Sequence, residues 1–346
     1  MEASTSTRSP GHQPKIYDIV TFGEAMIRLS TPKHQRLEQS TELDLSVGGA
    51  ELNVAAGASR LGLRTAWVSR LPLNPLGRLV NNKGREFGVD MDHTLWTEGE
   101  RVGIYFVEHG ASPRPTQVFY DRIPSSMTLI QPGMIDWETL LKRTRLFHVS
   151  GITAAISSSA ASVVKEALQT ARSVDCLVSY DLNYRAQLWS IEEARTAQVP
   201  LMDYVDILVT SIPDEPGVNE LISGLSGEKP AQVAQKLVEY FGFRAVLVTK
   251  RGSSSMNQPT WTSLAYADNQ AYTDRTYTIQ SVDRLGGGDA CVAGFLTGYL
   301  EGDISYAVHL GNAFSALTQT SPTDWPWPTR EEAEELIISG ESQIRR

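Results

Sequence analysis

The sequence predicts an α/β fold: a doubly wound, mainly parallel sheet flanked by helices, with a small β-sheet lid. Three observations lead to this prediction. From residue 146 onward, apolar strand-like runs alternate with helical patterns, as in parallel sheets covered on both faces. Two glycine-rich stretches near opposite ends of the chain each open a helix of small residues. Residues 101–122 read as a separate hairpin.

The first half of the chain supplies the edge of the main sheet and the strands of the lid. The glycine pair Gly48-Gly49 opens a helix that Gly62 closes, and Asn53 lies in its first turn, where a polar ligand could reach it. We expect the lid to take its strands from about residues 26–47 and 98–123. The predicted elements are strands at 17–24, 26–29, 43–47 and 65–70, and helices at 48–62 and 76–87.

The hairpin carries a tyrosine and an arginine two residues apart. Side chains alternate along a strand, so Tyr120 and Arg122 are predicted to share a face. That pairing suits a polyhydroxylated, anionic ligand. The alternative is an exposed amphipathic hairpin, with Arg122 paired to a nearby acid such as Asp121, and the hairpin pattern by itself favours this alternative.

The second half predicts the rest of the parallel sheet. Ligands of such sheets bind at the carboxyl ends of the strands. Polar segments follow the strands there, at residues 181–185, 210–215 and 250–254. A loop at 321–328 with two Trp-Pro pairs separates the last two helices. The predicted strands are 146–149, 176–181, 207–210, 245–249 and 276–282, and the helices 159–172, 191–202, 231–241, 309–320 and 330–338.

The stretch from Val282 to Phe295 is the centre of the predicted site. Gly286, Gly287 and Gly288 precede a run of small apolar residues with helical spacing, so they stand at a helix N-terminus, which favours anions such as phosphate. The negative charge of Asp289 repels such an anion, so a carboxylate is unexpected at this position. A good reason for it is a role as the base that takes a proton from an attacking hydroxyl. The alternative is a tight turn with Asp289 capping the helix.

Bulk properties exclude several classes. The formal net charge is −9 with both signs mixed along the chain, so no nucleic-acid surface is expected, and no apolar stretch is long enough for a membrane. Residues 1–14 are Ser/Thr-rich and lack an apolar signal core, which predicts a disordered tail. Cys176 and Cys291 lie in apolar runs and predict buried thiols, so we expect a cytoplasmic location.

Two motifs carry a family resemblance. Gly48-Gly49-x-x-x-Asn53-Val54-Ala55 resembles the N-terminal signature of the ribokinase-like (PfkB-type) carbohydrate kinases, and Asp283-x-x-Gly286-Gly287-Gly288-Asp289 resembles their C-terminal signature. The resemblance extends from about Tyr17 onward, so residues 15–346 are predicted to form one kinase domain with a small lid. Within the family, the chain is most similar to 2-keto-3-deoxygluconate kinases, in segments 48–51, 118–122, 150–152, 181–189, 250–252 and 283–289.

The resemblance implies ATP-dependent phosphorylation of 2-keto-3-deoxygluconate to its 6-phosphate by in-line transfer. Asp289 would be the general base, and the three glycines would form the anion hole. Arginine suits the carboxylate of a sugar acid through forked hydrogen bonds. The implied sugar-acid contacts are Gly48, Gly49, Asn53, Tyr105, Tyr120, Arg122, Arg185, Asp289 and Asp324. The implied nucleotide contacts are Asn183, Ser211, Lys250, Gly252, Ser254, Gly286, Gly288 and Asn312.

Some predictions leave alternatives open. The family often has Asn-x-x-Glu near magnesium and phosphate, where this chain has Ser211-x-x-Asp214, so Asp214 is expected to act on Mg²⁺ through water. A monovalent cation is left open. The partners expected are the sugar acid, ATP and a second copy of the chain, in a homodimer or higher homo-oligomer. The alternatives are a fructokinase, a ribokinase, a 5-keto-2-deoxygluconate kinase, or a non-catalytic sugar-binding protein of the same fold.

Overall fold

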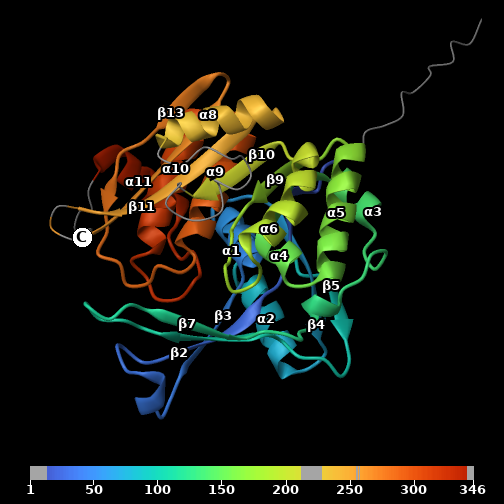
Figure 1. The fold of residues 1–346 in the computed structure, drawn as a ribbon, viewed down its shortest axis with the longest axis vertical. Coiled ribbons are helices and arrows are strands. Elements are labelled where there is room, and N and C mark those ends of the chain that lie inside the picture. Colours follow the sequence, from blue (N-terminus) through green and yellow to red (C-terminus); the bar gives the residue numbers. More distant parts are fainter. Residues whose placement is uncertain (1–13, 212–227, 255, 257, 341–346) are drawn as a thin grey trace, which may run out of the picture.

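A ten-stranded sheet forms the body of the protein. This computed structural model describes residues 14–211, 228–254, 256 and 258–340. The strands from β11 to β5 run parallel, and β12 and β13 add an antiparallel edge, which confirms the predicted doubly wound, mainly parallel sheet (Figure 1). In spatial order the strands are β13 (Gln270–Thr273), β12 (Pro259–Ala267), β11 (Ala245–Ser253), β10 (Ile207–Ser211), β9 (Leu177–Asp181), β8 (Thr144–Ser150), β1 (Tyr17–Phe22), β4 (Thr65–Pro72) and β5 (Thr94–Thr97), with β14 (Tyr277–Thr278) paired to β12.

Helices cover both faces of this sheet. Successive strand residues point to opposite faces, so Val20 and Phe147 pack in one core while Ile19 and Leu146 pack in the other. One face carries α3 (Trp137–Lys142), α4 (Gly151–Ala155), α5 (Ser158–Ser173) and α8 (Pro230–Phe241), with α6 (Ile191–Gln198) beside α4. The other carries α1 (Ala50–Arg60), α9 (Gly287–Glu301), α10 (Ile304–Thr318) and α11 (Arg330–Ser339).

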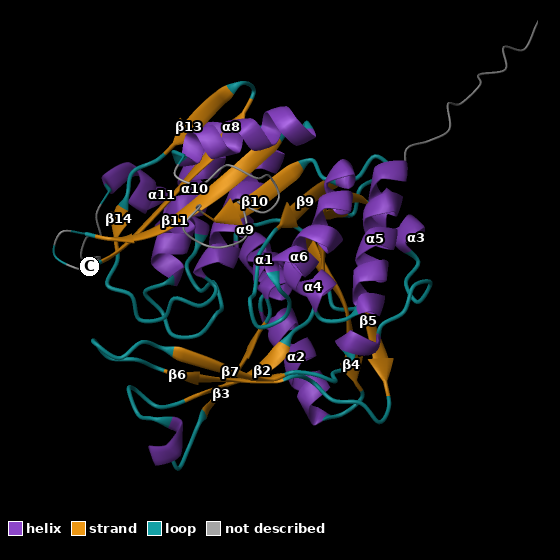
Figure 2. Ribbon diagram, viewed as in Figure 1, coloured by secondary structure: helices purple, strands orange, loops and turns teal. Residues whose placement is uncertain are grey.

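A separate four-stranded sheet lies beside the large one (Figure 2). Its order is β3 (Asp44–Gly48), β2 (Met26–Ser30), β6 (Ile104–Glu108) and β7 (Gln117–Asp121), and α2 (Pro75–Glu86) packs against β2 and β3. Arg28 pairs in register with Tyr105, and Tyr105 with Tyr120, so these three side chains share one face. The rings of Tyr105 and Tyr120 stack with centroids 5.9 Å apart. That this sheet acts as a lid stays a prediction.

The sequence did not predict β5, α3 or α4, and two further stretches differ from the sequence-based expectation. The hairpin of β12 and β13 was not expected, although its turn residues Asp268 and Asn269 both adopt the positive φ that favours such hairpins. The strand expected at 276–282 is only Tyr277–Thr278, because the backbone leaves the sheet and Val282 donates to the carbonyl of Gln319. Residues 1–13 of the predicted tail lie outside the described residues. Within the described part, no helix is long and apolar enough to cross a membrane.

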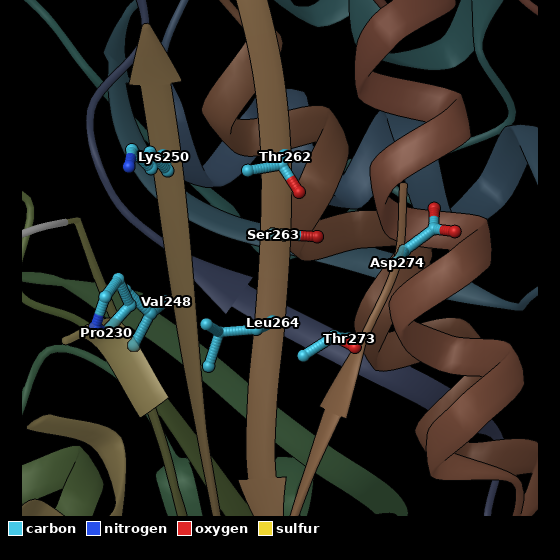
Figure 3. A pocket seen from close by; sticks show the side chains of 8 residues that line it. All are labelled: Pro230, Val248, Lys250, Thr262, Ser263, Leu264, Thr273 and Asp274. Carbon is cyan, nitrogen blue, oxygen red and sulfur yellow. The ribbon is translucent and has the colours of Figure 1, made fainter. Parts of the chain in front are cut away.

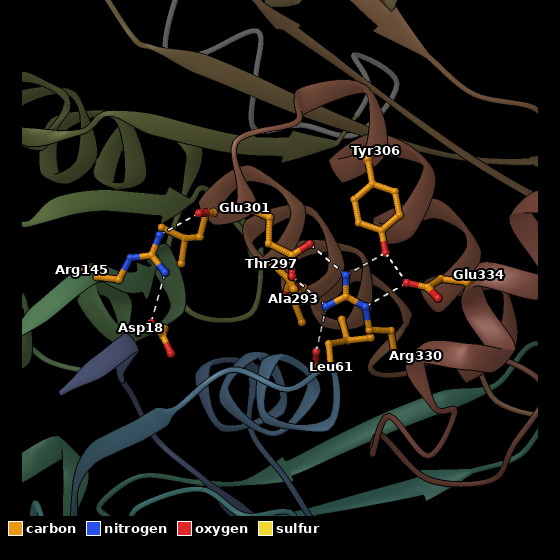
Figure 4. A network of polar contacts seen from close by, with 10 residues as sticks. Asp18, Leu61, Arg145, Ala293, Thr297, Glu301, Tyr306, Arg330 and Glu334 are labelled. Atoms are coloured by element: carbon orange, nitrogen blue, oxygen red, sulfur yellow. Dashed lines mark hydrogen bonds and ion pairs between the residues drawn. The ribbon is translucent and has the colours of Figure 1, made fainter. Parts of the chain in front are cut away.

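A polar network ties the C-terminal helices to the rest of the domain (Figure 4). Arg330, the first residue of α11, holds Glu301 with two hydrogen bonds of 2.7 and 2.9 Å and contacts Glu334 at 2.9 Å. It also donates to the hydroxyl of Tyr306 and to the carbonyl of Leu61 at the end of α1. One guanidinium therefore joins α1, α9, α10 and α11.

Arg330→Leu should lower the free energy of unfolding by about 1–2 kcal/mol, since it removes a forked carboxylate pair that is only partly exposed. Urea unfolding of the variant and of the wild type measures the difference. Arg195→Leu is the matched control, because that exposed arginine on α6 has no side-chain partner among the described residues. Equal losses in both variants would show that the network does not stabilise the fold.

Candidate active site

The glycine turn before α9 is shaped by close backbone approach. Gly286 has φ 76°, and a Cβ there would lie 2.1 Å from the carbonyl oxygen of Asp324, so a larger residue does not fit. Gly287 packs against Gln319, whereas a Cβ on Gly288 would meet nothing within 4 Å. No side chain caps α9. Because no side chain caps this helix and the space beside Gly288 is open, an anion can bind at the N–H groups of the first turn.

Asp289 stands in this first turn, as predicted from the sequence. The amide Nδ2 of Asn53, in the first turn of α1, donates to its Oδ2 at 2.7 Å. The two glycine signatures thus meet in space, although these residues are 236 positions apart. Burial raises the pKa of Asp289 to about 7, a rise that the Asn53 bond opposes and the charge of Asp324 adds to. A carboxyl group with that pKa can accept a proton near neutral pH.

A second titrating carboxyl group lies at the same rim. Burial raises the pKa of Asp181, the last residue of β9, to about 7, and the charge of Asp289 adds to the rise. Asp181 accepts bonds from the backbone and side-chain amides of Asn183, which has φ 38°. The positive charge of the exposed Arg185 opposes the rise in both carboxyl groups. The structure therefore gathers Asp181, Asn183, Arg185 and Asp289.

A buried ionic cluster connects the small sheet to the glycine turn. We call Arg28, Asp283, Asp324 and Tyr105 the Arg28 cluster. The guanidinium of Arg28 binds the carboxylates of Asp283 and Asp324, and the Tyr105 hydroxyl donates to Asp324 at 2.8 Å. Gly48 lies against it, since a Cβ there would stand 2.1 Å from the Tyr105 hydroxyl. Three predicted sugar contacts, Gly48, Tyr105 and Asp324, are thus neighbours.

Arg122 lies in a buried ion pair that the sequence did not reveal. Its Nε binds Glu24, at the end of the β1 strand region, and the other Glu24 oxygen accepts a bond from Ser125. The alternative, in which Arg122 pairs with a nearby acid, is confirmed with Glu24 as that acid. Asp121, the example expected from the sequence, forms instead a forked pair with Arg101 at 2.9 and 2.8 Å. The role of Arg122 as a sugar-acid contact stays a prediction.

Two further predicted sugar contacts, Gly49 and Tyr120, lie close to Glu24 and to the Arg28 cluster. Gly49 is the N-cap of α1, and a Cβ there would be 2.4 Å from the carbonyl oxygen of Glu24. Tyr120 is 43% exposed on the inner face of β7, above Tyr105. Both are therefore placed next to residues that line the site.

The predicted nucleotide contacts cluster at neighbouring strand ends. Ser211 ends β10 and pairs in register with Thr249, next to Lys250 on β11. Gly252 lies two residues further along β11, and Ser254 follows the strand. Asp214, the predicted residue near Mg²⁺, lies outside the described residues. Ser211, Lys250, Gly252 and Ser254 therefore border one rim.

A cavity of about 130 Å³ opens beside Lys250 and Asp274 (Figure 3). Asn312, on α10, is fully buried nearby and donates to the Asp274 carboxylate and to the Arg275 carbonyl, both at 2.8 Å. In this structure Asn312 braces the turn after β13, so a direct nucleotide contact by Asn312 stays a prediction.

Three buried charged residues of the site were missed in the sequence. Arg28 and Glu24 sit in short strand regions that read as apolar, and a charge in such a run was the available signal. Glu51 is fully buried in the first turn of α1, where its carboxylate accepts bonds from Ser150 and Thr153. Burial raises its pKa. Glu51 therefore ties the first turn of α1 to the end of β8.

The sequence profile of the pfkB family carbohydrate kinases matches residues 17–330. The chain belongs to this family. It is a carbohydrate kinase, which phosphorylates a sugar hydroxyl from ATP. The predicted ribokinase-like fold and kinase activity are confirmed at this level.

Three relatives illustrate the similarity. A 2-dehydro-3-deoxygalactonokinase of Haloferax volcanii is 37% identical over 330 residues, which covers 95% of this chain and 99% of the relative. A 5-dehydro-2-deoxygluconokinase of Bacillus licheniformis is 29% identical over 334 residues, covering 95% and 98%. The crystal structure of a 2-dehydro-3-deoxygluconokinase from Thermotoga maritima has a TM-score of 0.87 at 36% identity, covering 94% of this chain and 100% of that chain.

The hydrogen bond from Asn53 to Asp289 predicts how kcat/KM depends on pH at the acid side of the profile (the acid limb). The ratio kcat/KM should fall below pH about 7, because Asp289 must be ionised to accept a proton. Asn53→Leu removes a donor that favours the ionised form, so the limb should move to higher pH by about one unit. Initial rates from pH 5 to 9 measure this shift. A limb that stays in place would show that Asn53 does not stabilise the carboxylate.

Proposed function

We propose that this kinase phosphorylates a 2-keto-3-deoxy sugar acid, the gluconate or its galactonate epimer, on the 6-hydroxyl. The single observation that carries the mechanism is Asp289, a carboxylate with a pKa near 7 in the first turn of an uncapped helix. Two relatives at 36–37% identity bear the names of kinases for these acids, in which dehydro denotes the keto group. Exposed Arg185 supplies positive charge for the substrate carboxylate, and buried Arg122, whose Nε binds Glu24, offers its other guanidinium N–H groups.

The chemistry follows from where these groups stand. Asp289 takes the proton of the attacking hydroxyl, and Asn53 holds the receiving carboxylate in place. The N–H groups at Gly286–Gly288 stabilise the charge on the phosphoryl group, which bound ATP supplies. Tyr105, Gly48 and Asp324 form the wall opposite, and closure of the small sheet would exclude water. Ser211 at the end of β10, together with Lys250, Gly252 and Ser254 at the end of β11, holds the nucleotide.

Mg²⁺ is proposed as the metal. Among the described residues, no three His, Cys, Asp or Glu side chains gather closely enough to hold a metal ion by themselves. Asp181, at the end of β9, supplies hard oxygen donors, which suit Mg²⁺ that is held through water and substrate phosphates. Asp214 keeps its predicted role near this ion.

We also propose a homodimer in a reducing, cytoplasmic environment. Leu45 and Phe119, on strands of the small sheet, are 55% and 45% exposed, which leaves apolar surface for a second copy. Both cysteines are buried free thiols, as expected without oxidising conditions.

Asp289→Asn should reduce kcat by about 10²–10⁴-fold, because it keeps the shape but removes the proton acceptor. The KM for ATP should stay within about twofold. A coupled assay of ADP release measures both, with a panel of 2-keto-3-deoxygluconate, its galactonate epimer, 5-keto-2-deoxygluconate, fructose and ribose. Near-normal kcat in the variant would exclude Asp289 as base. Wild-type preference for fructose or ribose would overturn the proposed substrate, as would no turnover of either 2-keto-3-deoxy sugar acid.

Arg122→Lys tests recognition of the substrate carboxylate while keeping a charge beside Glu24. The fork of the guanidinium is lost, so KM for the sugar acid should rise about tenfold or more, with KM for ATP unchanged. Arg122→Leu is less informative, because it leaves buried Glu24 unpaired and should cost about 3–5 kcal/mol of stability. Arg101→Lys, at the exposed pair with Asp121, is the matched control. Unchanged sugar-acid KM in Arg122→Lys would remove Arg122 from the binding site.

A further inference from the structure

Apart from Asp324, the loop at residues 321–328 has no part in the chemistry described so far, yet its first tryptophan is one of the largest fully buried side chains. The Trp325 ring stacks on Phe87, at the end of α2, with centroids 4.6 Å apart. The Lys83 ammonium lies 5.7 and 5.8 Å from the Phe87 and Trp325 ring centroids. We call Lys83, Phe87 and Trp325 the aromatic clamp. It fixes the indole from one side.

The other side of the indole reaches the sugar side of the site. The Trp325 ring N–H donates to the backbone carbonyl of Val47. Val47 directly precedes Gly48, and Trp325 directly follows Asp324. This one bond therefore joins the residues next to two predicted sugar contacts. Those two contacts are themselves in close approach, since a Cβ on Gly48 would lie 2.6 Å from the Asp324 carboxylate.

The backbone on the far side of Asp324 is strained. Thr323 has φ 76°, a left-handed conformation that a β-branched residue rarely adopts. Such a conformation persists only where the surrounding contacts hold it, and it is frequent at functional sites. Here Arg28 and Tyr105 bind the Asp324 side chain, and the Asp324 carbonyl packs on the Gly286 turn. Trp325, the residue that follows Asp324, is itself held by the aromatic clamp and by its bond to Val47.

We propose that Trp325 is a positioning residue for sugar binding. Its indole, held by the aromatic clamp and bound to Val47, sets where the Asp324 carboxylate stands relative to Gly48 and the Gly286 turn. Trp325 itself touches neither the substrate nor the reacting atoms. This proposal rests on the proposed function, because it takes Asp324 as a sugar contact. A tryptophan that only filled the core would stabilise the fold without affecting sugar affinity.

Trp325→Phe keeps the stacked ring and removes the N–H. We expect KM for the sugar to rise about five- to tenfold, the factor that corresponds to one ordinary hydrogen bond, while kcat and KM for ATP stay within about twofold. Trp327→Phe is the matched control. Trp327 belongs to the same loop and packs on the same Phe87, but it is 42% exposed and next to neither Gly48 nor Asp324. Its KM values should equal those of the wild type.

The outcomes separate the two roles. A Trp325→Phe enzyme that melts earlier but keeps its sugar KM would overturn the proposal, as would equal rises in both KM values. If Trp325→Phe does not fold, Phe87→Leu loosens the clamp and leaves the N–H in place. It should raise the sugar KM in the same direction, and an unchanged sugar KM would again overturn the proposal. If the wild type prefers a neutral sugar, the proposed substrate fails, and the same KM split is then measured with that sugar.

Discussion

The buried guanidinium of Arg28 is the interaction on which the geometry of the site depends. Burial opposes its charge, but the carboxylates of Asp324 and Asp283 outweigh that effect and hold the pKa of Arg28 above its usual value. Arg28 comes from the small sheet, whereas its two partners flank the glycine turn before α9. A buried ion pair adds little net stability, yet loss of one partner costs about 3–5 kcal/mol because the other charge stays buried. The cluster therefore connects the small sheet to the glycine turn through charges that cannot be removed singly without a large cost.

Small residues at the helix contacts bring the catalytic groups together. A Cβ on Gly294 would lie 2.6 Å from Gly311, and a Cβ on Gly298 would lie 2.5 Å from Ala307, so α9 and α10 pack backbone against backbone. A Cβ on Gly57 of α1 would lie 2.7 Å from the methyl group of Ala293 on α9, so these two helices are also in close contact. Helices this close have little freedom to shift. The first turns of α1 and α9 are thereby fixed near each other, which lets Asn53 reach Asp289.

The electrostatics of the rim suit proton transfer near neutral pH. Asp181 and Asp289 both have a pKa of about 7, mainly because burial disfavours their charge. The Asn53 bond sets which carboxylate oxygen stays fixed.

Local patterns in the sequence are enough to predict the parallel sheet, the helix that begins at the three glycines, and Asp289 in its first turn. These patterns are apolar periodicity, glycine at positions of close approach, and the small residues that follow. The partners of the charged side chains, in contrast, depend on how the chain folds in three dimensions. Arg122 binds Glu24, 98 positions away, and Arg28 binds Asp324, 296 positions away, while Asn312 turns to Asp274 and Arg275. A charge in a strand reveals that a partner is needed, but strand order and helix packing select that partner, because burial and ion-pair geometry depend on residues distant along the chain.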